Sequence, residues 1–487
     1  MVAIIYQPKM TELIDVDSDD YIEFETTVNE LIDEYIQNNA VKMSSPDFHE
    51  DLIGEITHLL YEEWVDVCIC TKNEENKNEI EYHVTNICND FFDTYHIPPR
   101  YYPISFADEM PDIQAIRSQI DTLKNAYQPR QRSQSWFEYR NNLITASNLW
   151  KVFGSDAQYN SLICEKCEPP RAFDLEGNVN TNSPMHWGVK YEPISVMYYE
   201  QKYGIKIGDF GCIQHPNYKC IGASPDGIVI EPETDERYGR MLEIKNIVNR
   251  DITGIPKEEY WIQMQIQMET CNLDWCDFLE TRFKEYTNVS AFYNDIRTSE
   301  LIVEKMEAEE SGVEHGQDPT FEFLEEDDEL SDEETMSVST AVSIPGIVRG
   351  VILHFIKKTF ETNAPKYVYM PLDVPIEKDS IDIWIRLERD THRELYSLYT
   401  TIYWYLDEYS CVCVKRNRVW FEAAASKIED IWKTIEKERV EGHAHRMAKK
   451  RKPEITVKLD EGNDNLVVQN MPILSKLCLV KLDHDET

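Results

Sequence analysis

The sequence predicts an α/β fold of the α+β sandwich kind, in which helices flank a mixed sheet. Helical and strand-like patterns alternate between residues 126 and 290, with Gly and Pro at the breaks. Their order is helix, helix, a meander of strands, helix and strand, which is typical of a sheet covered by helices. A helical N-terminal region and an insertion at about residues 291–400 complete the expected architecture.

Residues 1–125 are expected to form a helical N-terminal domain. Apolar side chains recur at intervals of three and four in "TTVNELIDEYIQ", "LIGEITHLLYEEWVDVCIC" and "VTNICNDFFDTYH", which is the period of one helix face. The stretch "HIPPRYYP" then interrupts the helical pattern. The aromatic and leucine stripes of these segments are interpreted as core side chains.

Residues 126–290 are expected to form the first part of the central domain. "SWFEYRNNLITASNLWKVFG" is predicted to begin with a polar turn and continue as a helix, and "VKYEPISVMYYEQKYG" to form a helix that ends at Gly204. Extended segments follow in "KIGDFGCIQHP", "KCIGASPDGIVIE" and "RMLEIKNI". "EEYWIQMQIQMETCN" is predicted to be helical and "CDFLETRFKEY" to be a strand.

The rest of the chain divides into three parts. Residues 291–400 contain the acidic run "EFLEEDDELSDEE", interpreted as a flexible solvated loop, and the strand-like "RGVILHFIK" and "KYVYMPLDVP". Residues 401–441 contain a predicted strand, "YSCVCVKRN", and a closing helix, "WFEAAASKIEDIWKTIEKERVEG". Residues 442–487 are expected to be a peripheral tail, in which "MAKKRKPE" is either a nuclear localisation signal or an ordinary exposed basic cluster.

Composition and charge narrow the class of protein. A hydrophobic fraction of 42% over 487 residues supports a globular core. No apolar run reaches the roughly 20 residues of a membrane span, and the 12 scattered cysteines favour reduced thiols, so a soluble intracellular protein is expected. The net charge of −41 argues against a nonspecific nucleic-acid binder, but residues 126–290 carry only about −6, which leaves room for a locally basic groove.

The chemistry concentrates between residues 221 and 247. Asp226 follows a tight turn, and Glu243 and Lys245 project from one face of a predicted strand. Acidic side chains on neighbouring half-buried strands are unfavourable unless a cation neutralises them. The two carboxylates and the Ile244 carbonyl would offer the hard oxygen ligands that Mg²⁺ prefers, and Lys245 would orient or activate a water and offset charge on phosphorus. The alternative is an exposed hairpin with an ordinary Glu/Lys face.

The surrounding sequence resembles a known family. "GASPDGIV" followed by "MLEIKNI" is similar to the PD-(D/E)XK motif of the lambda-exonuclease-like, YqaJ-type viral recombinase nucleases, which include forms from large DNA viruses of eukaryotes. "SWFEYRNNLITASNLWKVFG" resembles the W-x-x-x-R…I-T-A-S segment of that family, "WGVKYEP" its W-G-x-x-x-E helix and "YWIQMQIQM" its Y-x-x-Q-x-Q helix. The resemblance covers residues 130–285 and implies a restriction-endonuclease-like mixed sheet.

The resemblance implies a metal centre. Asp226 and Glu243, with the Ile244 carbonyl, would bind a catalytic Mg²⁺, which Mn²⁺ could replace. Glu192 in "WGVKYEP" would help to hold a second ion, and Lys245 would be the catalytic lysine.

Two further sets of side chains receive roles from the resemblance. Gln263 would position the attacking water with Tyr260 one turn earlier on the same face, and Gln265 is the rival of Gln263 because one helix cannot aim both glutamines at one point. The substrate-binding set comprises Arg140, Ser147, Ser224 and Tyr260. The first three would hold a terminal 5′ phosphate, because guanidinium and hydroxyl groups both suit phosphate oxygens.

The implied activity is that of a Mg²⁺-dependent 5′-to-3′ exonuclease, which digests one strand of double-stranded DNA from an end and exposes 3′ single strands for recombination or repair. Every implied catalytic position keeps its functional side chain, which favours an active deoxyribonuclease. A catalytically inactive nuclease-fold scaffold that binds DNA ends, and a structure-specific endonuclease of the same superfamily, are the alternatives.

The resemblance also implies partners and a domain plan. Double-stranded DNA ends are the expected substrate, a single-strand annealing protein and a homo-oligomer are candidate partners, and no membrane contact is expected. For a viral protein the compartment would be the host cytoplasm, at the viral factory, or the nucleus. Shorter relatives pass quickly from the strand near residues 276–286 to the closing strand and helix, so residues 291–400 would interrupt one discontinuous nuclease domain.

Overall fold

The computed structural model describes residues 13–14, 19–103, 112–131, 133–170, 180–181, 183–295, 342–343, 348–359 and 364–447. The described residues up to Arg446 belong to one compact unit. The acidic run at 322–334 and nearly all of "MAKKRKPE" lie outside the described residues. No described helix combines the length and the apolar character that a membrane crossing requires.

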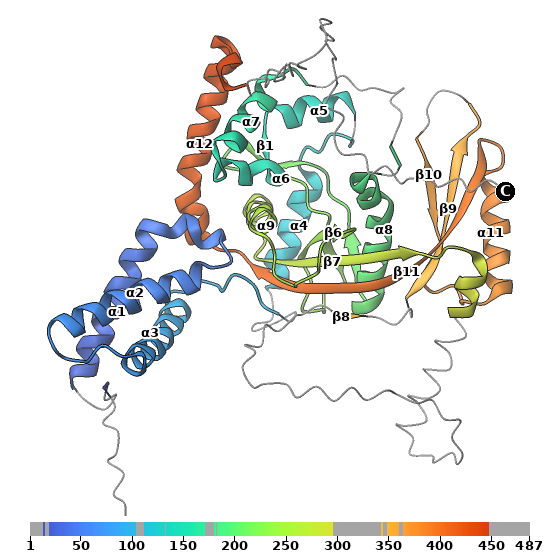
Figure 1. Ribbon diagram of the computed structural model, residues 1–487. Helices are drawn as coiled ribbons and strands as arrows, with labels where there is room; N and C mark the ends of the chain where they lie inside the picture. Colours follow the sequence, from blue (N-terminus) through green and yellow to red (C-terminus); the bar gives the residue numbers. More distant parts are fainter. Residues whose placement is uncertain are drawn as a thin grey trace, which may run out of the picture. The chain divides into compact units, whose positions relative to one another are not determined.

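One mixed sheet forms the centre of the molecule (Figure 1). Its strand order is β10-β9-β11-β7-β6-β5-β2, and the short β8 pairs with β11. Only β6 and β7 run parallel to each other, and every other neighbouring pair is antiparallel. The strands are β2 (Lys206–Gly208), β5 (Gly227–Glu231), β6 (Met241–Asn246), β7 (Trp275–Glu285), β8 (Val342–Ser343), β9 (Arg349–Lys357), β10 (Lys366–Tyr369) and β11 (Tyr396–Lys415).

Two helices cover opposite faces of this sheet. Met241 of β6 packs in the same apolar cluster as Met264 of α9 (Glu258–Cys271). Leu242 packs with Tyr199 of α8 (Pro184–Tyr203) in another cluster. Because successive side chains of a strand point to opposite faces, α8 and α9 lie on opposite sides of β6 (Figure 1). The expected mixed sheet flanked by helices is therefore confirmed.

The predicted C-terminal end of α8 is confirmed at Gly204, which has a left-handed φ of 67°, whereas the helix begins at Pro184, before the predicted segment. The continuous helix predicted for "SWFEYRNNLITASNLWKVFG" is wrong. The segment breaks because Ile144 pairs with Ile221 in a second, three-stranded sheet, and the Ile144 N–H donates to Cys220 O at 2.7 Å. Its elements are α5 (Gln134–Asn141), β1 (Ile144–Thr145), α6 (Ala146–Leu149) and η2 (Trp150–Val152), with β3 (Ile213–Gln214) and β4 (Ile221–Ala223) completing the small sheet.

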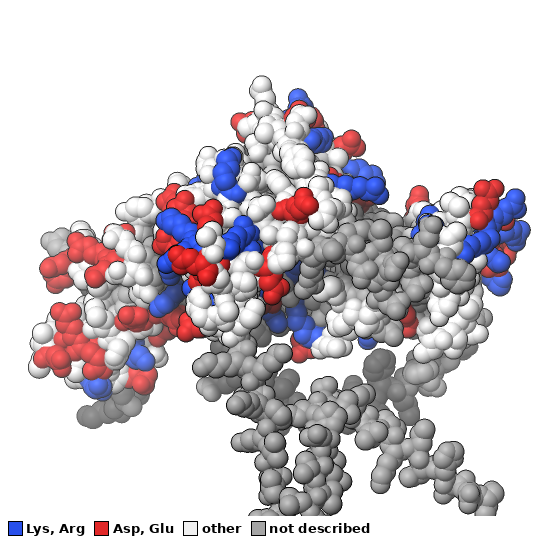
Figure 2. All heavy atoms as spheres, turned by 90° about the horizontal axis from the view of Figure 1, so that it is seen from above, with Lys and Arg blue, Asp and Glu red and all other residues white. Residues whose placement is uncertain are grey.

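The N-terminal region is helical, as its periodicity predicts. The helices are α1 (Asp19–Asn39), η1 (Ala40–Ser44), α2 (Phe48–Asp66), α3 (Glu74–Thr94) and α4 (Ile113–Asn125). Hydrogen bonds join this region to the central helices: Ser44 Oγ donates to Glu258 Oε1 at 2.7 Å, and Trp261 Nε1 donates to Arg100 O at 2.8 Å. Figure 2 shows acidic side chains gathered over the N-terminal helices on the left, whereas both signs are interspersed elsewhere on that face.

The strands of the expected insertion extend the central sheet. The first half of β11 pairs with β9, from Tyr396↔Lys357 to Tyr405↔Arg349. Its second half pairs with β7, ending at Lys415↔Trp275. The expected domain boundary at 400 therefore falls within β11, and the strand predicted as "YSCVCVKRN" is only its last part.

Further helical elements belong to the described chain. α11 (Lys378–His392) was not predicted. It buries Ile381 and Trp384 in an apolar cluster that includes side chains of β9. α12 (Arg418–Glu441) follows β11 directly and confirms the predicted closing helix. α7 (Asp156–Cys167) packs against α12 and the short η3 (Ala444–Arg446).

Candidate active site

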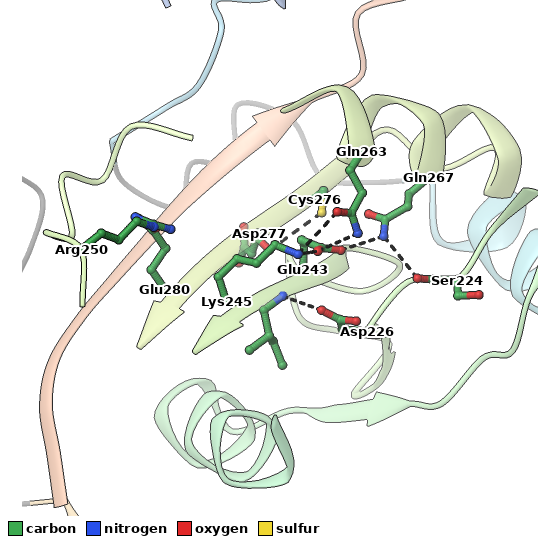
Figure 3. A network of polar contacts seen from close by, with 11 residues as sticks. Ser224, Asp226, Glu243, Lys245, Arg250, Gln263, Gln267, Cys276, Asp277 and Glu280 are labelled. Atoms are coloured by element: carbon green, nitrogen blue, oxygen red, sulfur yellow. Dashed lines mark hydrogen bonds and ion pairs between the residues drawn. The ribbon is translucent and has the colours of Figure 1, made fainter. Parts of the chain in front are cut away.

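Asp226 lies beside β6, at the point where β5 begins. Its N–H donates to Leu242 O at 3.2 Å, and its Oδ2 accepts the Ile244 N–H at 2.7 Å (Figure 3). The lack of a side chain at Gly227 allows the backbone at this position to pack closely against Ile207, because a Cβ at Gly227 would lie 2.2 Å from Cγ2 of Ile207. The turn thus fixes the Asp226 carboxylate against the backbone of β6.

The Ile244 carbonyl belongs to the same edge of β6. Along this strand, Arg240 O accepts from Val229 N at 2.8 Å and Leu242 O accepts from Asp226 N, so the carbonyls of even-numbered residues point toward β5. The alternation of a β-strand directs the Ile244 carbonyl to that edge as well. The β5–β6 ladder ends at the Leu242 position, so the backbone next to Ile244 faces the Asp226 carboxylate.

Glu243 is fully buried and receives three side-chain donors. Lys245 Nζ and Gln263 Nε2 both donate to Oε1, the latter at 2.7 Å, and Gln267 Nε2 donates to Oε2 at 2.7 Å. Lys245 Nζ also donates to Gln263 Oε1 at 3.4 Å and lies 4.8 Å from the ring centroid of Tyr260. The carboxylate, the ammonium and the amide therefore form one polar network on the α9 face of β6 (Figure 3).

The hydrogen bonds of α9 distinguish Gln263 from Gln265. Gln263 faces Glu243, whereas Gln265 bonds to the start of α12: its Nε2 donates to Lys415 O at 3.0 Å and its Oε1 accepts from Asn417 N at 2.7 Å. Sequence reasoning missed Gln267. The available signal was its spacing of four residues from Gln263, which places both side chains on one face of a helix.

The charges of the site are unbalanced toward the negative. Burial and the neighbouring Glu243 carboxylate raise the pKa of Asp226 well above its ordinary value, Lys245 offsets part of this effect, and Glu192 adds to it. Burial alone would lower the pKa of Lys245, but the charges of Glu243 and Asp226 outweigh it and raise that pKa. Glu192 is exposed on α8, and its negative charge acts on Asp226.

A divalent cation fits this donor set. Among the described residues no group of three or more His, Cys, Asp or Glu side chains has the arrangement of a metal site. Mg²⁺, however, is commonly held by one or two carboxylates with waters in the remaining positions. Asp226, Glu243 and the Ile244 carbonyl offer only oxygen. Burial, followed by the Glu243 charge, raises the pKa of Asp226, and a cation bound beside it would favour the ionised form.

The expected phosphate-binding side chains also converge. Arg140 Nη2 lies 3.5 Å from Thr145 Oγ1, which lies 3.4 Å from Ser147 Oγ. Burial raises the pKa of the Cys212 thiol, and the charge of Arg140, followed by the polar groups of Ser224 and Arg140, acts in the opposite direction. The break between α5 and α6 brings Arg140 and Ser147 to the turn that carries Ser224.

A second cation next to this group was not predicted. Lys166 is buried, its Nζ donates to Arg140 O at 3.0 Å, and burial lowers its pKa to about 8. The sequence around it, "ICEKC", gives no signal for such a position. Arg140 and Lys166 bring two basic groups to this end of the site, and Glu165 lies 3.8 Å from Lys166 Nζ.

The α8 face of the sheet carries a supporting polar network. Ser195 Oγ donates to Asn246 Oδ1 at 2.7 Å and lies 3.0 Å from Thr281 Oγ1. Tyr199 OH donates to Asp277 Oδ2 at 2.6 Å. These bonds tie α8 to the parallel pair β6 and β7, and so fix the strands that carry the acidic residues.

An aspartate just before β5, a glutamate-x-lysine pair on β6 and a glutamine from the covering helix form the arrangement that the resemblance to PD-(D/E)XK nucleases implies. Residues 135–274 match the family described as the YqaJ-like viral recombinase domain. The resemblance to that family is thereby confirmed for the segment that carries Arg140, Asp226, Glu243, Lys245 and Gln263.

Individual relatives were found as well. The chain is 26% identical over 333 residues to "Uncharacterized protein R354" of Acanthamoeba polyphaga mimivirus. The aligned segment covers 65% of this chain and 54% of that protein. The chain thus spans about half the length of this curated relative.

Two solved structures show limited similarity. The crystal structure of LHK-Exo in complex with dAMP is 18% identical, with 63% of this chain and 95% of that chain covered and a TM-score of 0.32. The alkaline exonuclease LHK-Exo from Laribacter hongkongensis is 29% identical, with 31% of this chain and 74% of that chain covered and a TM-score of 0.25. The fold class given above rests on the strand order and helix packing of this chain itself.

Proposed function

We propose that the protein is a Mg²⁺-dependent deoxyribonuclease that digests one strand of double-stranded DNA from an end, in the 5′-to-3′ direction, and exposes 3′ single strands for recombination or repair. The observation that carries this proposal is the network of Glu243, Lys245 and Gln263 on β6 and α9, next to an Asp226 carboxylate that is bonded to the Ile244 N–H of the same strand. The match of residues 135–274 to the YqaJ-like viral recombinase domain supports it.

Asp226 and Glu243, with the Ile244 carbonyl, would hold the ion. Mg²⁺ bound there would polarise the scissile phosphate and lower the pKa of a bound water. The raised pKa of Lys245 keeps its side chain an ammonium at neutral pH, so it donates hydrogen bonds and offsets charge that develops on the phosphate oxygens. Gln263 Oε1, which already accepts from Lys245, keeps a second lone pair that can hold the attacking water.

Recognition of the 5′ phosphate is proposed to restrict cleavage to DNA ends. Arg140 would make paired hydrogen bonds to its oxygens, Ser147 and Ser224 would complete the contacts, and the buried ammonium of Lys166 would add to the positive potential. A pocket that accepts only a terminal phosphate restricts cleavage to ends, whereas an open groove would also admit internal phosphodiesters.

Purified protein should be incubated with four substrates in Mg²⁺ or EDTA: linear duplex with 5′ phosphates, linear duplex with 5′ hydroxyls, nicked circles and closed circles. Digestion that needs Mg²⁺, prefers phosphorylated linear duplex and releases label from the 5′ end first supports the proposal. Cutting of closed circles identifies an endonuclease, and binding of DNA ends without digestion in either Mg²⁺ or Mn²⁺ identifies an inactive scaffold.

The proposed partners follow from this activity. A protein that anneals single strands would act on the exposed 3′ tails, and light scattering with and without duplex DNA would test for a homo-oligomer. The compartment of action is proposed to be the host cytoplasm or nucleus.

A further inference from the structure

Gln267 links the two parts of the site. It lies in α9 four residues after Gln263 and is fully buried. Its Nε2 donates to Glu243 Oε2 at 2.7 Å and to the backbone carbonyl of Ser224 at 3.3 Å (Figure 3). One amide group therefore bridges an expected metal ligand and the turn that carries both Ser224 and Asp226.

The orientation of this amide is determined by its neighbours. A carboxylate oxygen and a carbonyl oxygen can only accept hydrogen bonds, so the NH₂ group must face them. Gln267 Oε1 is then left buried without a hydrogen-bond partner among the described residues. An unpaired buried acceptor is unfavourable, and a methionine of similar length would avoid that cost. A role in packing alone does not account for a glutamine at this position.

Glu243 has a specific need for such a donor. The last torsion of a glutamate side chain is broad, so packing alone does not fix the rotation of the carboxylate. Lys245 and Gln263 hold only Oε1, and Gln267 is the described side chain that holds Oε2. Without it the Oε2 oxygen would lose its donor and the Ser224 turn would lose its link to α9.

We propose that Gln267 is a positioning residue that couples the metal centre to the terminal-phosphate pocket, by fixing the Glu243 carboxylate and the Ser224 turn relative to each other. This inference rests on the proposed function and deepens it. A phosphate held at Ser224 restrains the turn, the turn restrains Gln267 and Asp226, and Glu243 is then held in the orientation that binds the ion. Metal affinity and preference for a 5′ phosphate should therefore depend on the same side chain.

Gln265 supplies a matched control. It lies in the same helix, is also fully buried, and donates from Nε2 to a backbone carbonyl, that of Lys415. Its partners belong to the junction of β11 and α12, away from Glu243. Gln265→Met and Gln267→Met thus make the same chemical change at equal burial, and only the second touches the proposed coupling.

The full chain and its variants should be compared by three measurements: the Mn²⁺ concentration that gives half-maximal digestion, direct Mn²⁺ binding by calorimetry, and the ratio of kcat/KM for 5′-phosphate and 5′-hydroxyl duplex. We expect Gln267→Met to weaken Mn²⁺ binding about 10- to 100-fold, in the range found for residues that orient metal ligands, and to reduce the phosphate preference. Gln265→Met should lower the thermal unfolding temperature without changing either quantity.

The inference is overturned when folded Gln267→Met matches the wild type in Mn²⁺ affinity and phosphate preference. Should the methionine variant fail to fold, Gln267→Asn decides in the same way, because its amide is one methylene too short to reach both acceptors. Failure of the proposed function would be seen differently, since the wild type itself would then neither bind Mn²⁺ nor digest DNA.

Discussion

The Asp226 carboxylate accepts a hydrogen bond from the backbone N–H of Ile244, the residue that separates Glu243 from Lys245. A side chain from one turn is thereby fixed to the strand that carries the other two charged groups. Because the bond involves the backbone, the distance between Asp226 and that strand does not depend on the rotamer of any second side chain.

Removal of the Lys245 ammonium should abolish cleavage without loss of metal binding. Lys245→Ala deletes the positive charge beside Glu243 and Asp226, so the site should attract a cation at least as well as before. We expect turnover to fall by about 10²- to 10⁴-fold, the usual effect of removing a positioned proton-transfer or charge-stabilising group. Lys284→Ala, which removes an exposed lysine paired with Asp407 on β11, is the control. Wild-type turnover in Lys245→Ala would contradict the assignment.

Asp226→Asn tests the metal centre with little disturbance of the fold. The amide oxygen of asparagine can still accept the Ile244 N–H, so the turn should keep its place. Loss of the negative charge should weaken Mn²⁺ binding by more than about 100-fold, beyond the effect of changing a residue that only orients a ligand. Calorimetric titration with Mn²⁺ measures this, and Asp209→Asn makes the same change at an exposed site. Equal affinities for the two variants would rule out Asp226 as a ligand.

Arg140→Ala should selectively impair the use of phosphorylated ends. Hydrogen bonds to charged groups contribute about 1.5–3 kcal/mol, so kcat/KM for 5′-phosphate duplex should fall roughly 10- to 100-fold, with a smaller change for 5′-hydroxyl duplex. Arg140→Lys should restore little, because an ammonium cannot make the paired contacts of guanidinium. The exposed Arg130 provides the control substitution Arg130→Ala. An equal loss on both kinds of end would place Arg140 outside the phosphate pocket.

Acid should destabilise the protein partly through His215. Burial, followed by the positive charges of Lys219 and Arg416, lowers the pKa of this histidine to about 4. Its Nδ1 accepts the N–H groups of Asn217 and Tyr218, both at 3.1 Å, so the folded state requires the neutral ring. The folded pKa lies below the unfolded value of 6.5, so this contribution is complete above pH 6.5 and is lost as the pH falls toward 4.

The matching variant is His215→Asn, whose side-chain oxygen can accept the same backbone donors but does not titrate. Between pH 6.5 and 4 its free energy of unfolding should fall less than that of the wild type, by up to about 3 kcal/mol. Urea unfolding at a series of pH values measures the difference. Parallel curves for the two proteins would show that His215 titrates normally in the folded state.

The acidic residues and the lysine were predictable because their signal is local. Glu243 and Lys245 are separated by one residue on a strand, and Asp226 follows a turn marked by Gly and Pro, so period and turn chemistry indicate where these side chains lie. Their catalytic roles come from the resemblance and stay predictions. Gln263 and Gln265 could not be ranked from period alone, since the rotation of α9 about its axis is set by what it packs against.

The other differences between the predicted and the observed structure arise from contacts between segments that are distant in the sequence. The break after α5 depends on pairing between Ile144 and Ile221, 77 positions apart, which helical periodicity cannot reveal. The full length of β11 depends on two partners, β9 and β7, that the chain brings to it from earlier in the sequence. Lys166 was missed for a similar reason, because its burial is created by packing around Arg140 and Arg439.

The length of β11 has a consequence for any shortened version of the protein. Its 20 residues pair with β9 over the first half of the strand and with β7 over the second half, with one register shift in each ladder. A chain cut at residue 400, the edge expected for the inserted segment, would leave rows of backbone donors and acceptors on both neighbours without partners. Unpaired strand edges readily pair with strands of other molecules. We therefore expect the shortened chain to aggregate rather than to form a smaller functional protein.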